Sequence, residues 1–566
     1  MVLTENKVPL STNRQTIMET FKTPLEAFLH WLQKDPNHIF LRQPINRKFI
    51  EYSRQDAFEE ALKIAGALHR MGLKRGDHVA LLSKNCAHWF MADLAIMLGG
   101  FISVPLYPTL DGDSIHEILV HSESKAIIVG KLDDYGSQKP GIPHIPKIGV
   151  GLYEIQEEHT WEDIVKTPTD FEPFEQNPED LITIMYTSGT TGNPKGVMHK
   201  VKSFNQVTNT GVEVLNIKNQ SKMFSYLPLS HIAERIGIEM VCLYTGSTAS
   251  FPESLETFPE DLASVQPDTF FAVPRIWQKF KEGVLSKIPQ KRLNIFLSIP
   301  VINNIIKKKI VHKLGLSKAS FCGSGAAPLA VSLQNWYKKL GVEIQQCYGM
   351  TEDCILSHFN LPTTNKFGTV GKPLPGVTSK LSPEGEILIK SDTLMVGYYK
   401  SPDQTAAMFT EDGFLKTGDL GEFDHDGFLS IVGRIKDQFK TDKGKYVTPS
   451  PIELELSKNT DLEHICLVGT GISQPIVLII PSEAGWAKGK ELLNSSILAS
   501  INALNPQLKK HEKIEKAVVM KENWTVDNGL MTPSMKIRRN RIEAIHQPMY
   551  LDWFSRKERV VYESDQ

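Results

Sequence analysis

Helical and strand-like segments alternate along the chain up to residue 378, and this alternation limits the folds that the chain can adopt. Residues 54–71 place apolar side chains three and four positions apart, which predicts an amphipathic helix that ends at Gly72. Strands separated by helices form parallel sheets covered on both faces, and such sheets bind ligands beyond the carboxyl ends of their strands. Apolar runs predict these strands over 78–82, 101–106, 126–129, 182–186, 268–273 and 319–322.

The pattern changes after residue 378. Short apolar runs separated by glycine-containing turns predict an antiparallel module, with strands within 385–391, 395–399, 414–424 and 427–434. Beyond Arg434, the apolar runs 464–469 and 475–480 flank a turn, and a helical stretch follows from Ser482. We therefore expect an α/β protein. Its large N-terminal domain (1–436) holds mostly parallel sheets flanked by helices and includes a small β-rich subdomain (378–433), and a small α+β C-terminal domain follows (437–566).

The charge balance and the cysteines exclude some classes of protein. The chain has 566 residues with 63 Lys+Arg against 65 Asp+Glu, a formal net charge of −2. A protein built to hold nucleic acid needs a basic excess, so we expect no nucleic-acid partner. The six cysteines are scattered singly, which predicts free thiols in a reducing compartment rather than a disulfide framework or a zinc site.

No segment has the pattern of a secretory signal or a membrane span. The first residues lack an apolar core. The most apolar stretch, 89–107, is interrupted by Asp93, by two glycines and by Pro105, whereas a membrane span needs about 20 apolar residues. We therefore predict a cytoplasmic protein. The sequence leaves peripheral membrane contact and the oligomeric state open.

The run Tyr186–Val197, YTSGTTGNPKGV, is the segment with the most distinctive chemistry. Its three glycines let the backbone approach a ligand closely, and successive amides in such a turn bind anions. A flexible surface turn does not explain four hydroxyl groups together with a lysine; these features suit a polyphosphate. The order differs from the common nucleotide P-loop, because Pro194 precedes the lysine and Gly196 follows it. The donors are Thr187, Ser188, Thr190, Thr191 and Lys195.

This run resembles the signature of the adenylate-forming superfamily, which includes acyl-CoA synthetases and luciferases. The resemblance spans roughly residues 20–545, and the forms PLSHIAER, VPRIW and LMTPSMKIRRN are most similar to long-chain fatty acyl-CoA synthetases. Further segments resemble the remaining motifs in the expected order: YLPLSHIAER (226–235), FFAVPRIWQKF (270–280), GSGAAPL (323–329), YGMTE (348–352), TGDLGEF (417–423), GRIKD (433–437) and NGLMTPSMKIRRN (528–540).

The first half-reaction of this superfamily brings one anion onto another, because a carboxylate attacks the α-phosphorus of ATP. Such a step needs positive charge, positioning and magnesium rather than a nucleophilic side chain. The resemblance implies that Glu352 and Thr187 hold Mg²⁺, a cation that prefers hard oxygen ligands. It also implies that Thr351 donates to the α-phosphate and that Tyr348, followed by Gly349, flanks the adenine.

The resemblance implies further nucleotide contacts. Asp419 would accept hydrogen bonds from the ribose hydroxyls, and Arg434 would contact the ribose or the adenylate phosphate. Lys536 matches the lysine that reaches the carboxylate and the α-phosphate. Without the resemblance, Lys536 would be interpreted as a solvated lysine and Asp419 as an aspartate that bonds to its own turn. The adenine pocket would be formed by Gly323, Ser324, Gly325 and Ala326, and the triphosphate would be held by Ser188, Gly189, Thr190, Thr191, Gly192 and Lys195.

The acyl site is predicted from two motifs. His231 matches a position that lines the acyl carboxylate pocket, and Arg235 stands where some relatives have a tryptophan gate. Acetyl-activating relatives carry a tryptophan that ends the pocket at the position of Gly349, so its absence predicts a deeper tunnel. Burial of an acyl chain contributes about 0.8 kcal/mol per CH₂. We therefore expect a medium-to-long-chain fatty acid.

The second half-reaction transfers the acyl group to a thiol. The resemblance implies that coenzyme A is the acceptor and that a mobile C-terminal cap domain rotates about a hinge at Lys436. Lys443 stands where long-chain relatives have a glycine on the thiol path, so an acyl-AMP ligase that loads a carrier protein is the alternative. A silent acyl- or nucleotide-binding protein is the third hypothesis. The main prediction is a fatty acid–CoA ligase that uses ATP, Mg²⁺ and coenzyme A.

Overall fold

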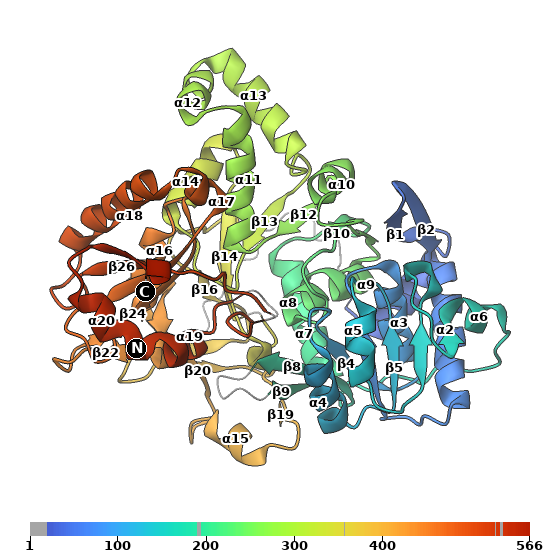
Figure 1. The fold of residues 1–566 in the computed structure, drawn as a ribbon. Helices are drawn as coiled ribbons and strands as arrows, with labels where there is room; N and C mark the ends of the chain where they lie inside the picture. Colours follow the sequence, from blue (N-terminus) through green and yellow to red (C-terminus); the bar gives the residue numbers. More distant parts are fainter. Residues whose placement is uncertain (1–19, 189–193, 356, 527, 533–535, 566) are drawn as a thin grey trace. The chain divides into compact units, whose positions relative to one another are not determined.

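The computed structural model describes residues 20–188, 194–355, 357–526, 528–532 and 536–565 (Figure 1). The chain divides into two compact units. Unit 1 comprises the residues up to Ala327 together with Val331–Ser379 and Ile389–Leu415. Unit 2 comprises Pro328–Ala330, Lys380–Leu388 and the residues from Lys416 onward. The boundary that we expect at residue 436 stays a prediction.

An eight-stranded sheet in the order β19-β9-β8-β4-β3-β5-β6-β7 is the main sheet of unit 1. Its strands from β8 to β7 pair in parallel, whereas β8 with β9 and β9 with β19 pair antiparallel. The parallel arrangement predicted for the early strands is therefore confirmed. The strands are β3 (His78–Leu82), β4 (Ile102–Leu106), β5 (Ala126–Val129), β6 (Lys147–Gly149), β7 (His159–Thr160), β8 (Leu181–Ser188), β9 (Pro194–Lys200) and β19 (Gly397–Tyr398).

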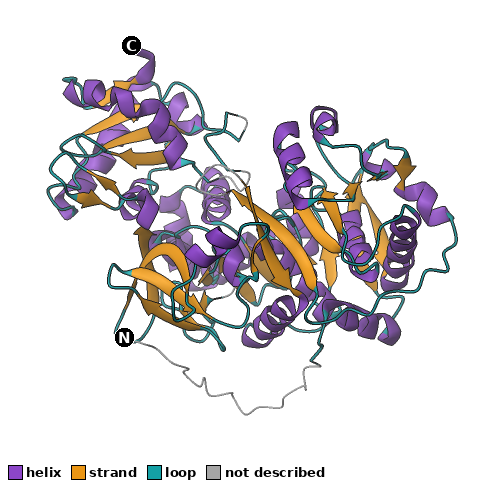
Figure 2. Ribbon diagram, turned by 90° about the horizontal axis from the view of Figure 1, so that it is seen from below, coloured by secondary structure: helices purple, strands orange, loops and turns teal. Residues whose placement is uncertain are grey.

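Helices cover both faces of this sheet (Figure 2). Val79 and Leu81 of β3 pack in one apolar cluster with the helices α2 (Arg54–Arg70) and α3 (Ala87–Leu98). Ala80 and Leu82 point to the opposite face and pack in a second cluster with α4 (Gly112–Ser122). The alternation of side chains along a strand thus explains why β3 is apolar throughout.

The predicted helix over 54–71 is confirmed as α2. It begins with a capping box in which the Ser53 side chain accepts from the Asp56 amide and the Asp56 side chain accepts from the Ser53 amide. The other helices of unit 1 are α1 (Pro24–Lys34), α5 (Tyr135–Gln138), α6 (Trp161–Lys166), α7 (Val201–Val214), α8 (Ile232–Glu234), α9 (Val241–Thr245), α10 (Phe258–Val265), α11 (Pro274–Lys287), α12 (Gln290–Ser298), α13 (Pro300–Lys313), α14 (Val331–Leu340) and α15 (Pro402–Ala407).

Unit 1 contains two smaller sheets. One has the order β10-β11-β1-β2, and the other has the order β12-β13-β14-β15-β16, in which β12, β13 and β14 are parallel. The predicted strands over 268–273 and 319–322 are confirmed as β12 and β13. The strands are β1 (Ile39–Ile45), β2 (Lys48–Ser53), β10 (Lys222–Phe224), β11 (Thr248–Ser250), β12 (Thr269–Phe271), β13 (Phe321–Ser324), β14 (Ile344–Tyr348), β15 (His358–Phe359) and β16 (Lys372–Pro373).

Much of unit 2 consists of two four-stranded sheets. The first has the order β17-β18-β20-β21, and the second has the order β24-β25-β26-β27, in which β24–β25 is antiparallel and the other pairs are parallel. A hairpin of β22 and β23 lies between them in sequence. The strands are β17 (Thr378–Leu381), β18 (Glu386–Lys390), β20 (Leu415–Phe423), β21 (Leu429–Arg434), β22 (Phe439–Lys440), β23 (Tyr446–Val447), β24 (Leu462–Val468), β25 (Ile476–Pro481), β26 (Lys516–Val519) and β27 (Val560–Tyr562).

The second sheet of unit 2 is also covered on both faces. Val477 and Ile479 of β25 pack in a cluster that includes residues of α16 (Pro449–Leu456) and α18 (Lys490–Leu504). Leu478 and Ile480 pack in a cluster that includes residues of α19 (Arg539–His546) and α20 (Tyr550–Ser555). The helical stretch expected from Ser482 begins as α17 (Glu483–Ala487), where the Ser482 side chain accepts from the Gly485 amide.

One predicted strand belongs to a different sheet. Residues 395–399 do not join the antiparallel module; their two-residue strand β19 pairs with β9 in the eight-stranded sheet. The reason is apolar burial, because Met395 and Tyr398 pack in one buried cluster with Val197 of β9. This correction places Tyr398 beside the signature run.

The expectations about cysteines and membrane spans can be compared with the structure. All six cysteines are buried and none forms a disulfide, as their scattered positions predict. Within the described ranges, no helix combines the length and the apolar character needed to cross a membrane.

Candidate active site

The signature run forms the end of the β8–β9 hairpin. Thr187 pairs with Lys195 and Tyr186 with Gly196, so the strands continue further into the run than the sequence suggests. The predicted phosphate contacts Gly189, Thr190, Thr191 and Gly192 lie outside the described residues, and so does the side chain of Ser188. The pairing of the two strands fixes the positions of Thr187, at the carboxyl end of β8, and of Lys195, at the start of β9.

Three side chains connect this hairpin to the YGMTE segment. The Lys195 ammonium lies 4.9 Å from the centre of the Tyr398 ring, which is a cation–π distance. The Tyr398 hydroxyl donates a hydrogen bond to Glu352 Oε1 at 2.7 Å. Burial and the Glu352 charge both raise the pKa of Tyr398, so the phenol stays protonated and remains a donor. A cation, a phenol and a buried carboxylate therefore meet at one point.

Backbone hydrogen bonds hold the same three segments together. The Met395 amide donates to the Glu352 carbonyl at 2.8 Å, and the Tyr399 amide donates to the Gly196 carbonyl at 2.8 Å. His199 of β9 contacts the Thr351 carbonyl through Nε2 at 2.7 Å. Burial lowers the pKa of His199 to about 4, so the ring is neutral near pH 7 and Nε2 carries the proton that it donates.

The turn after Tyr348 is tightly folded. Asp353 is buried and accepts hydrogen bonds from the amides of Met350 and Ile355 at 2.9 and 2.8 Å. Burial raises the pKa of Asp353 to about 7, against the effect of these two hydrogen bonds. Ile355 has a φ of +79°, which is strained for a β-branched residue. Such strain is typical of segments that tertiary contacts hold in place.

This turn corrects the expectation attached to Gly349. A Cβ atom at Gly349 would lie 1.6 Å from the Ile355 carbonyl oxygen, so backbone occupies the space that a side chain would take. The absence of a tryptophan at this position therefore does not by itself open a deeper tunnel. Glycine is required here because the chain passes close to itself.

The predicted adenine segment and the YGMTE segment leave neighbouring parallel strands. Ser324 of β13 pairs with Gln346 of β14, so residues 325–328 and 349–352 emerge at the same sheet edge. A Cβ atom at Gly325 would lie 2.8 Å from the Cys347 sulfur, which explains a glycine in the packing of this edge. Tyr348 lies with its ring centre 6.1 Å from that of His358. Adenine binding by Gly323, Ser324, Gly325, Ala326 and Tyr348 stays a prediction.

A second group of predicted residues lies within unit 2. Asp419 and Arg434 face each other across the β20–β21 pair, and Arg434 Nε lies 2.9 Å from Asp419 Oδ1. Asp419 is buried, whereas the Arg434 side chain is 55% exposed. The ion pair occupies one carboxylate oxygen of the residue that we expect at the ribose.

Lys536 belongs to the same electrostatic group. Its amide donates to Thr532 Oγ1 at 3.0 Å, and its carbonyl accepts from the Thr532 amide at 2.7 Å. The residue as a whole is exposed. Protein atoms around the ammonium group and the Arg434 charge lower the pKa of Lys536 to about 8, while Asp419 acts in the opposite direction. Lys436, the expected hinge residue, is exposed in the short helix Ile435–Asp437.

The two residues predicted for the acyl site have different surroundings. His231 caps α8, because its Nδ1 accepts from the Ala233 amide at 3.2 Å. Arg235 is fully buried, and its Nη2 donates to both carboxylate oxygens of Asp93, at 2.8 and 2.7 Å, while its Nη1 donates to Thr183 Oγ1 at 2.7 Å. A gate must move to admit a chain, so this buried ion pair argues against a gate at Arg235.

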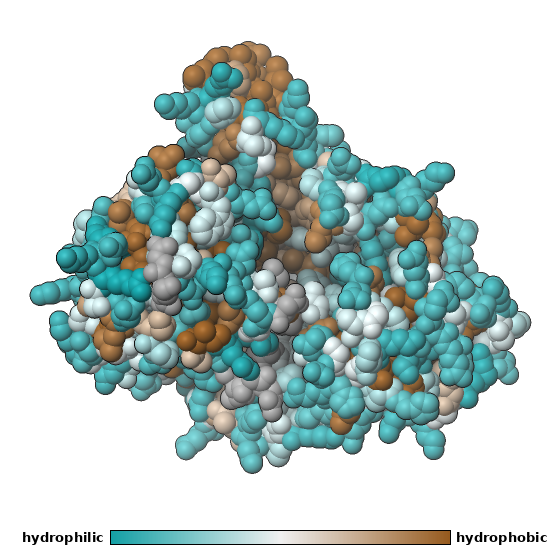
Figure 3. All heavy atoms as spheres, viewed as in Figure 1, coloured by the Kyte–Doolittle hydropathy of each residue, from teal (hydrophilic) through white to brown (hydrophobic). Residues whose placement is uncertain are grey.

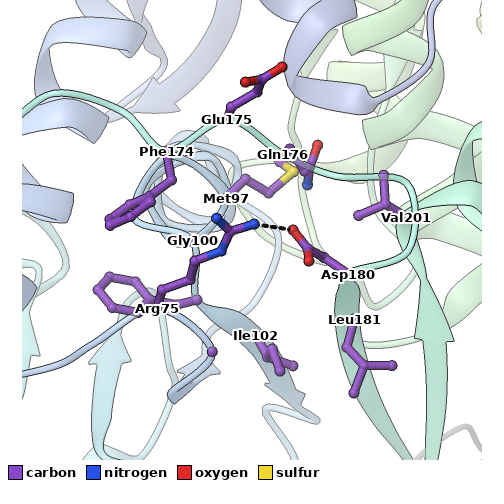
Figure 4. Close-up of a pocket in the computed structure, with 12 residues that line it drawn as sticks. Arg75, Met97, Gly100, Ile102, Phe174, Glu175, Gln176, Asp180, Leu181 and Val201 are labelled. Atoms are coloured by element: carbon purple, nitrogen blue, oxygen red, sulfur yellow. Dashed lines mark hydrogen bonds and ion pairs between the residues drawn. The ribbon is translucent and has the colours of Figure 1, made fainter.

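A pocket on unit 1 lies away from these residues (Figure 4). It is lined by Ile102 and Leu181, the first residues of β4 and β8, and the Arg75–Asp180 ion pair crosses it at 2.8 Å. The signature hairpin instead follows the carboxyl end of β8. Because open α/β sheets bind ligands at the carboxyl ends of their strands, this pocket is not the predicted nucleotide site.

Sequence reasoning missed Tyr398 and His199. Tyr398 lies in the segment wrongly given to the antiparallel module, and His199 lies two residues beyond the signature run. A histidine two residues beyond that run is a weak signal, and only the fold brings its ring to the Thr351 carbonyl. Among the described residues, no three His, Cys, Asp or Glu side chains gather as a metal-binding group.

The α/β fold, the hairpin that carries the signature run and the order of the further motifs are those of the adenylate-forming class. Comparison with known proteins agrees. The model of the AMP-binding enzyme family matches residues 28–399, and that of the AMP-binding enzyme C-terminal domain matches residues 436–549. The chain belongs to the AMP-binding enzyme family.

Similar proteins cover nearly the whole chain. Long chain acyl-CoA synthetase 3 of Arabidopsis thaliana is 28% identical over 91% of this chain and 89% of its own. Fatty acyl-CoA synthetase A of Dictyostelium discoideum is 28% identical over 88% and 85%. The crystal structure of the adenylation domain of a carboxylate reductase from Mycobacterium chelonae has a TM-score of 0.77 at 22% identity and covers 95% of this chain and 92% of that one. This structural likeness establishes the fold.

Proposed function

We propose that the chain is an ATP-dependent ligase that activates a medium-to-long-chain fatty acid as acyl-AMP and transfers the acyl group to coenzyme A. The observation that supports the first half-reaction best is the meeting of Lys195, Tyr398 and Glu352 at the end of the signature hairpin. This arrangement combines a cation for phosphate oxygens with an oriented buried carboxylate. Both are what the attack of one anion on another requires.

The residues present fit a magnesium ion bound together with a nucleotide. Mg²⁺ in such sites uses one or two carboxylates and completes its coordination with phosphate oxygens and water. Glu352 supplies a buried carboxylate, and Thr187, which pairs with Lys195 across the β8–β9 hairpin, supplies a hydroxyl. The ion, when bound, would neutralise phosphate charge. The role of Tyr398 would be to orient the carboxylate, as outer partners of metal ligands commonly do.

Lys536 is the proposed cation for the reacting carboxylate and α-phosphate. Its pKa is lowered to about 8, so the charged fraction of this side chain falls as the pH rises through that region. The charged form is the one that stabilises the developing negative charge, so adenylation should decline as the pH rises through that value. Asp419 and Arg434 are the proposed ribose and phosphate contacts.

The proposals for the acyl substrate and for the thiol acceptor are supported by other observations. The two relatives described above are named for long-chain and fatty acyl-CoA synthesis, at 28% identity. Gly349 no longer supports a long chain, because the Ile355 backbone fills the space beside it. Lys443 is exposed in the β22–β23 turn, and Gly444 takes the left-handed conformation with a φ of +72°. Coenzyme A therefore stays the proposed acceptor, with a carrier protein as the alternative.

A carboxylate panel tests the proposal. Pyrophosphate release is measured with fatty acids of increasing chain length and with short and aromatic acids, each with and without coenzyme A. Rapid thioester formation on free coenzyme A would reject the carrier-protein alternative. Absence of ATP turnover with every acid would favour a silent binding protein.

A single variant separates the two half-reactions. Lys536→Ala should nearly abolish acyl-AMP formation from the acid and ATP, while a preformed acyl-AMP should still react with coenzyme A. Retained ATP–pyrophosphate exchange in this variant would remove Lys536 from the proposed mechanism.

A further inference from the structure

The helices α12 and α13 carry a concentrated patch of exposed apolar side chains. Among the described residues, sixteen large apolar side chains are exposed, and five of them lie within residues 295–305. Three are more than half exposed: Ile295 at 58%, Val301 at 73% and Ile305 at 60%. The space-filling view shows apolar atoms gathered over α12 and α13 (Figure 3). Contiguous exposed apolar surface of this kind marks an interaction site.

The same segment is strongly basic. Residues 287–313 contain seven lysine or arginine residues and no aspartate or glutamate, in a chain whose net charge is −2. Six of these residues stand at the ends of α12 and α13 that lie away from the turn between the two helices, and Lys287 is the last residue of α11. The seven are Lys287, Lys291, Arg292, Lys307, Lys308, Lys309 and Lys313. We call residues 295–305 the apolar tip and these seven residues the basic collar.

The spacing of tip and collar matches the depth of a lipid headgroup layer. Within α13, Ile302 of the tip and Lys308 of the collar are six positions apart, and Ile305 and Lys307, where tip and collar approach most closely, are two positions apart. A helix rises by about 1.5 Å per residue, so these pairs are separated by about 9 Å and about 3 Å along it. Helices at membrane surfaces bury their apolar face by about 5–10 Å into the boundary of headgroups and acyl chains. A tip at that depth leaves the collar level with the phosphates.

Packing and a hydrogen bond hold the α12–α13 hairpin at its base, and the apolar tip takes no part in these contacts. Leu293 of α12 and Ile310 of α13 are buried, at 1% and 6% exposed. The Trp336 indole donates to Gln290 Oε1 at 2.9 Å, which ties the start of α12 to α14. Folding therefore holds the helices in place without covering Ile295, Val301 or Ile305, and these side chains stay available to a partner.

We propose that the α12–α13 hairpin docks this protein onto an anionic lipid bilayer. The apolar tip enters the boundary between headgroups and acyl chains, and the basic collar binds the anionic headgroups. Charge complementarity favours this partner. A second copy of the chain is disfavoured, because two collars of seven positive charges would repel each other. The proposal does not depend on which acid the enzyme activates.

Vesicle flotation tests the proposal with the full chain. Vesicles of phosphatidylcholine alone are compared with vesicles that also contain phosphatidylglycerol, at low and high salt. The wild type should float with the anionic vesicles, at least tenfold more strongly than with the neutral ones, and less strongly at high salt. The combined variant Ile295→Gln, Val301→Gln and Ile305→Gln should lose at least tenfold in vesicle affinity.

Two further variants separate the effect of the basic collar and the effect of exposed apolar side chains elsewhere from that of the apolar tip. Lys307→Gln, Lys308→Gln and Lys309→Gln together should lose at least tenfold on anionic vesicles. A matched control removes three apolar side chains that are equally exposed elsewhere, Leu255→Gln, Leu492→Gln and Leu551→Gln, at 83%, 64% and 68% exposure. This control should bind vesicles within about twofold of the wild type.

Several results would overturn the proposal. They are failure of the wild type to bind anionic vesicles, full binding by the tip variant, and an equal loss in the control variant. Sedimentation of the wild type as a dimer that the tip variant abolishes would assign the patch to self-association instead. Thermal melting and ATP–pyrophosphate exchange are measured for each variant; unchanged values in the tip variant show that lost flotation is not lost folding.

Discussion

The hydrogen bond from Tyr398 to Glu352 gives the most specific prediction. Tyr398→Phe removes only the hydroxyl that donates to Glu352 Oε1 at 2.7 Å, and it leaves the ring beneath the Lys195 ammonium. A hydrogen bond to a charged group contributes about 1.5–3 kcal/mol. Removal of such a partner from a metal-binding carboxylate lowers metal affinity by about 10–100-fold. If Glu352 holds Mg²⁺, the variant should need that much more Mg²⁺.

ATP–pyrophosphate exchange measured over a wide range of Mg²⁺ concentration is the assay. The half-saturating Mg²⁺ concentration of Tyr398→Phe should rise by about 10–100-fold, with much of the exchange rate recovered at high Mg²⁺. Tyr398→Leu removes the ring as well, so it should lose the cation–π contact with Lys195. That contact is worth about 0.5–2 kcal/mol, and its loss should reduce exchange further at every Mg²⁺ concentration.

Tyr399→Phe is the matched control. The Tyr399 hydroxyl also donates to a carboxylate, Glu123 Oε2 at 2.9 Å, but this pair is exposed. Exposed pairs contribute about 0–1 kcal/mol, so this variant should keep the Mg²⁺ dependence of the wild type. An unchanged Mg²⁺ dependence in Tyr398→Phe, or an equal rise in Tyr399→Phe, would refute the role assigned to the Tyr398 hydroxyl.

Three further predictions concern charge and packing. Adenylation should decline with a single ionisation near pH 8 as Lys536 loses its proton. Lys536→Arg, if it retains activity, should remove that decline from the pH profile. A wild-type profile that stays flat to about pH 9.5 would contradict this prediction. Arg235→Met leaves the buried Asp93 carboxylate unpaired and should destabilise unit 1 by about 3–5 kcal/mol in urea unfolding, whereas Arg42→Met, at an exposed pair, should cost less than about 1 kcal/mol. Gly349→Ala places a methyl group 1.6 Å from a backbone carbonyl oxygen, so it should lower the melting temperature and abolish exchange; wild-type values for both would show that the turn can move.

Local patterns were enough to predict many of the elements. The strand over residues 78–82 has the predicted bounds, and the helix over 54–71 differs from α2 by one residue at its end. Both depend on side chains within one short segment, where apolar spacing and a capping residue decide the conformation. The order of motifs likewise indicated the family without any knowledge of the fold.

Pairing between distant segments was not predictable in the same way. Residues 395–399 have the same short apolar pattern as their neighbours, yet their strand pairs with β9, about two hundred residues earlier in the chain. Nothing in a five-residue segment states which sheet edge is free to receive it. The role of Tyr398 at Glu352 depends on that pairing and was missed for this reason.

The sequence by itself predicted the helix over 54–71, the helical stretch from Ser482, several of the strands and the family, because each depends on the spacing of nearby residues. The tertiary structure alone decided that Tyr398 orients Glu352, that Arg235 is locked in a buried ion pair, and that backbone fills the space beside Gly349. A sequence shows which side chain each position carries. Only the folded structure shows which atoms fill the space around that side chain.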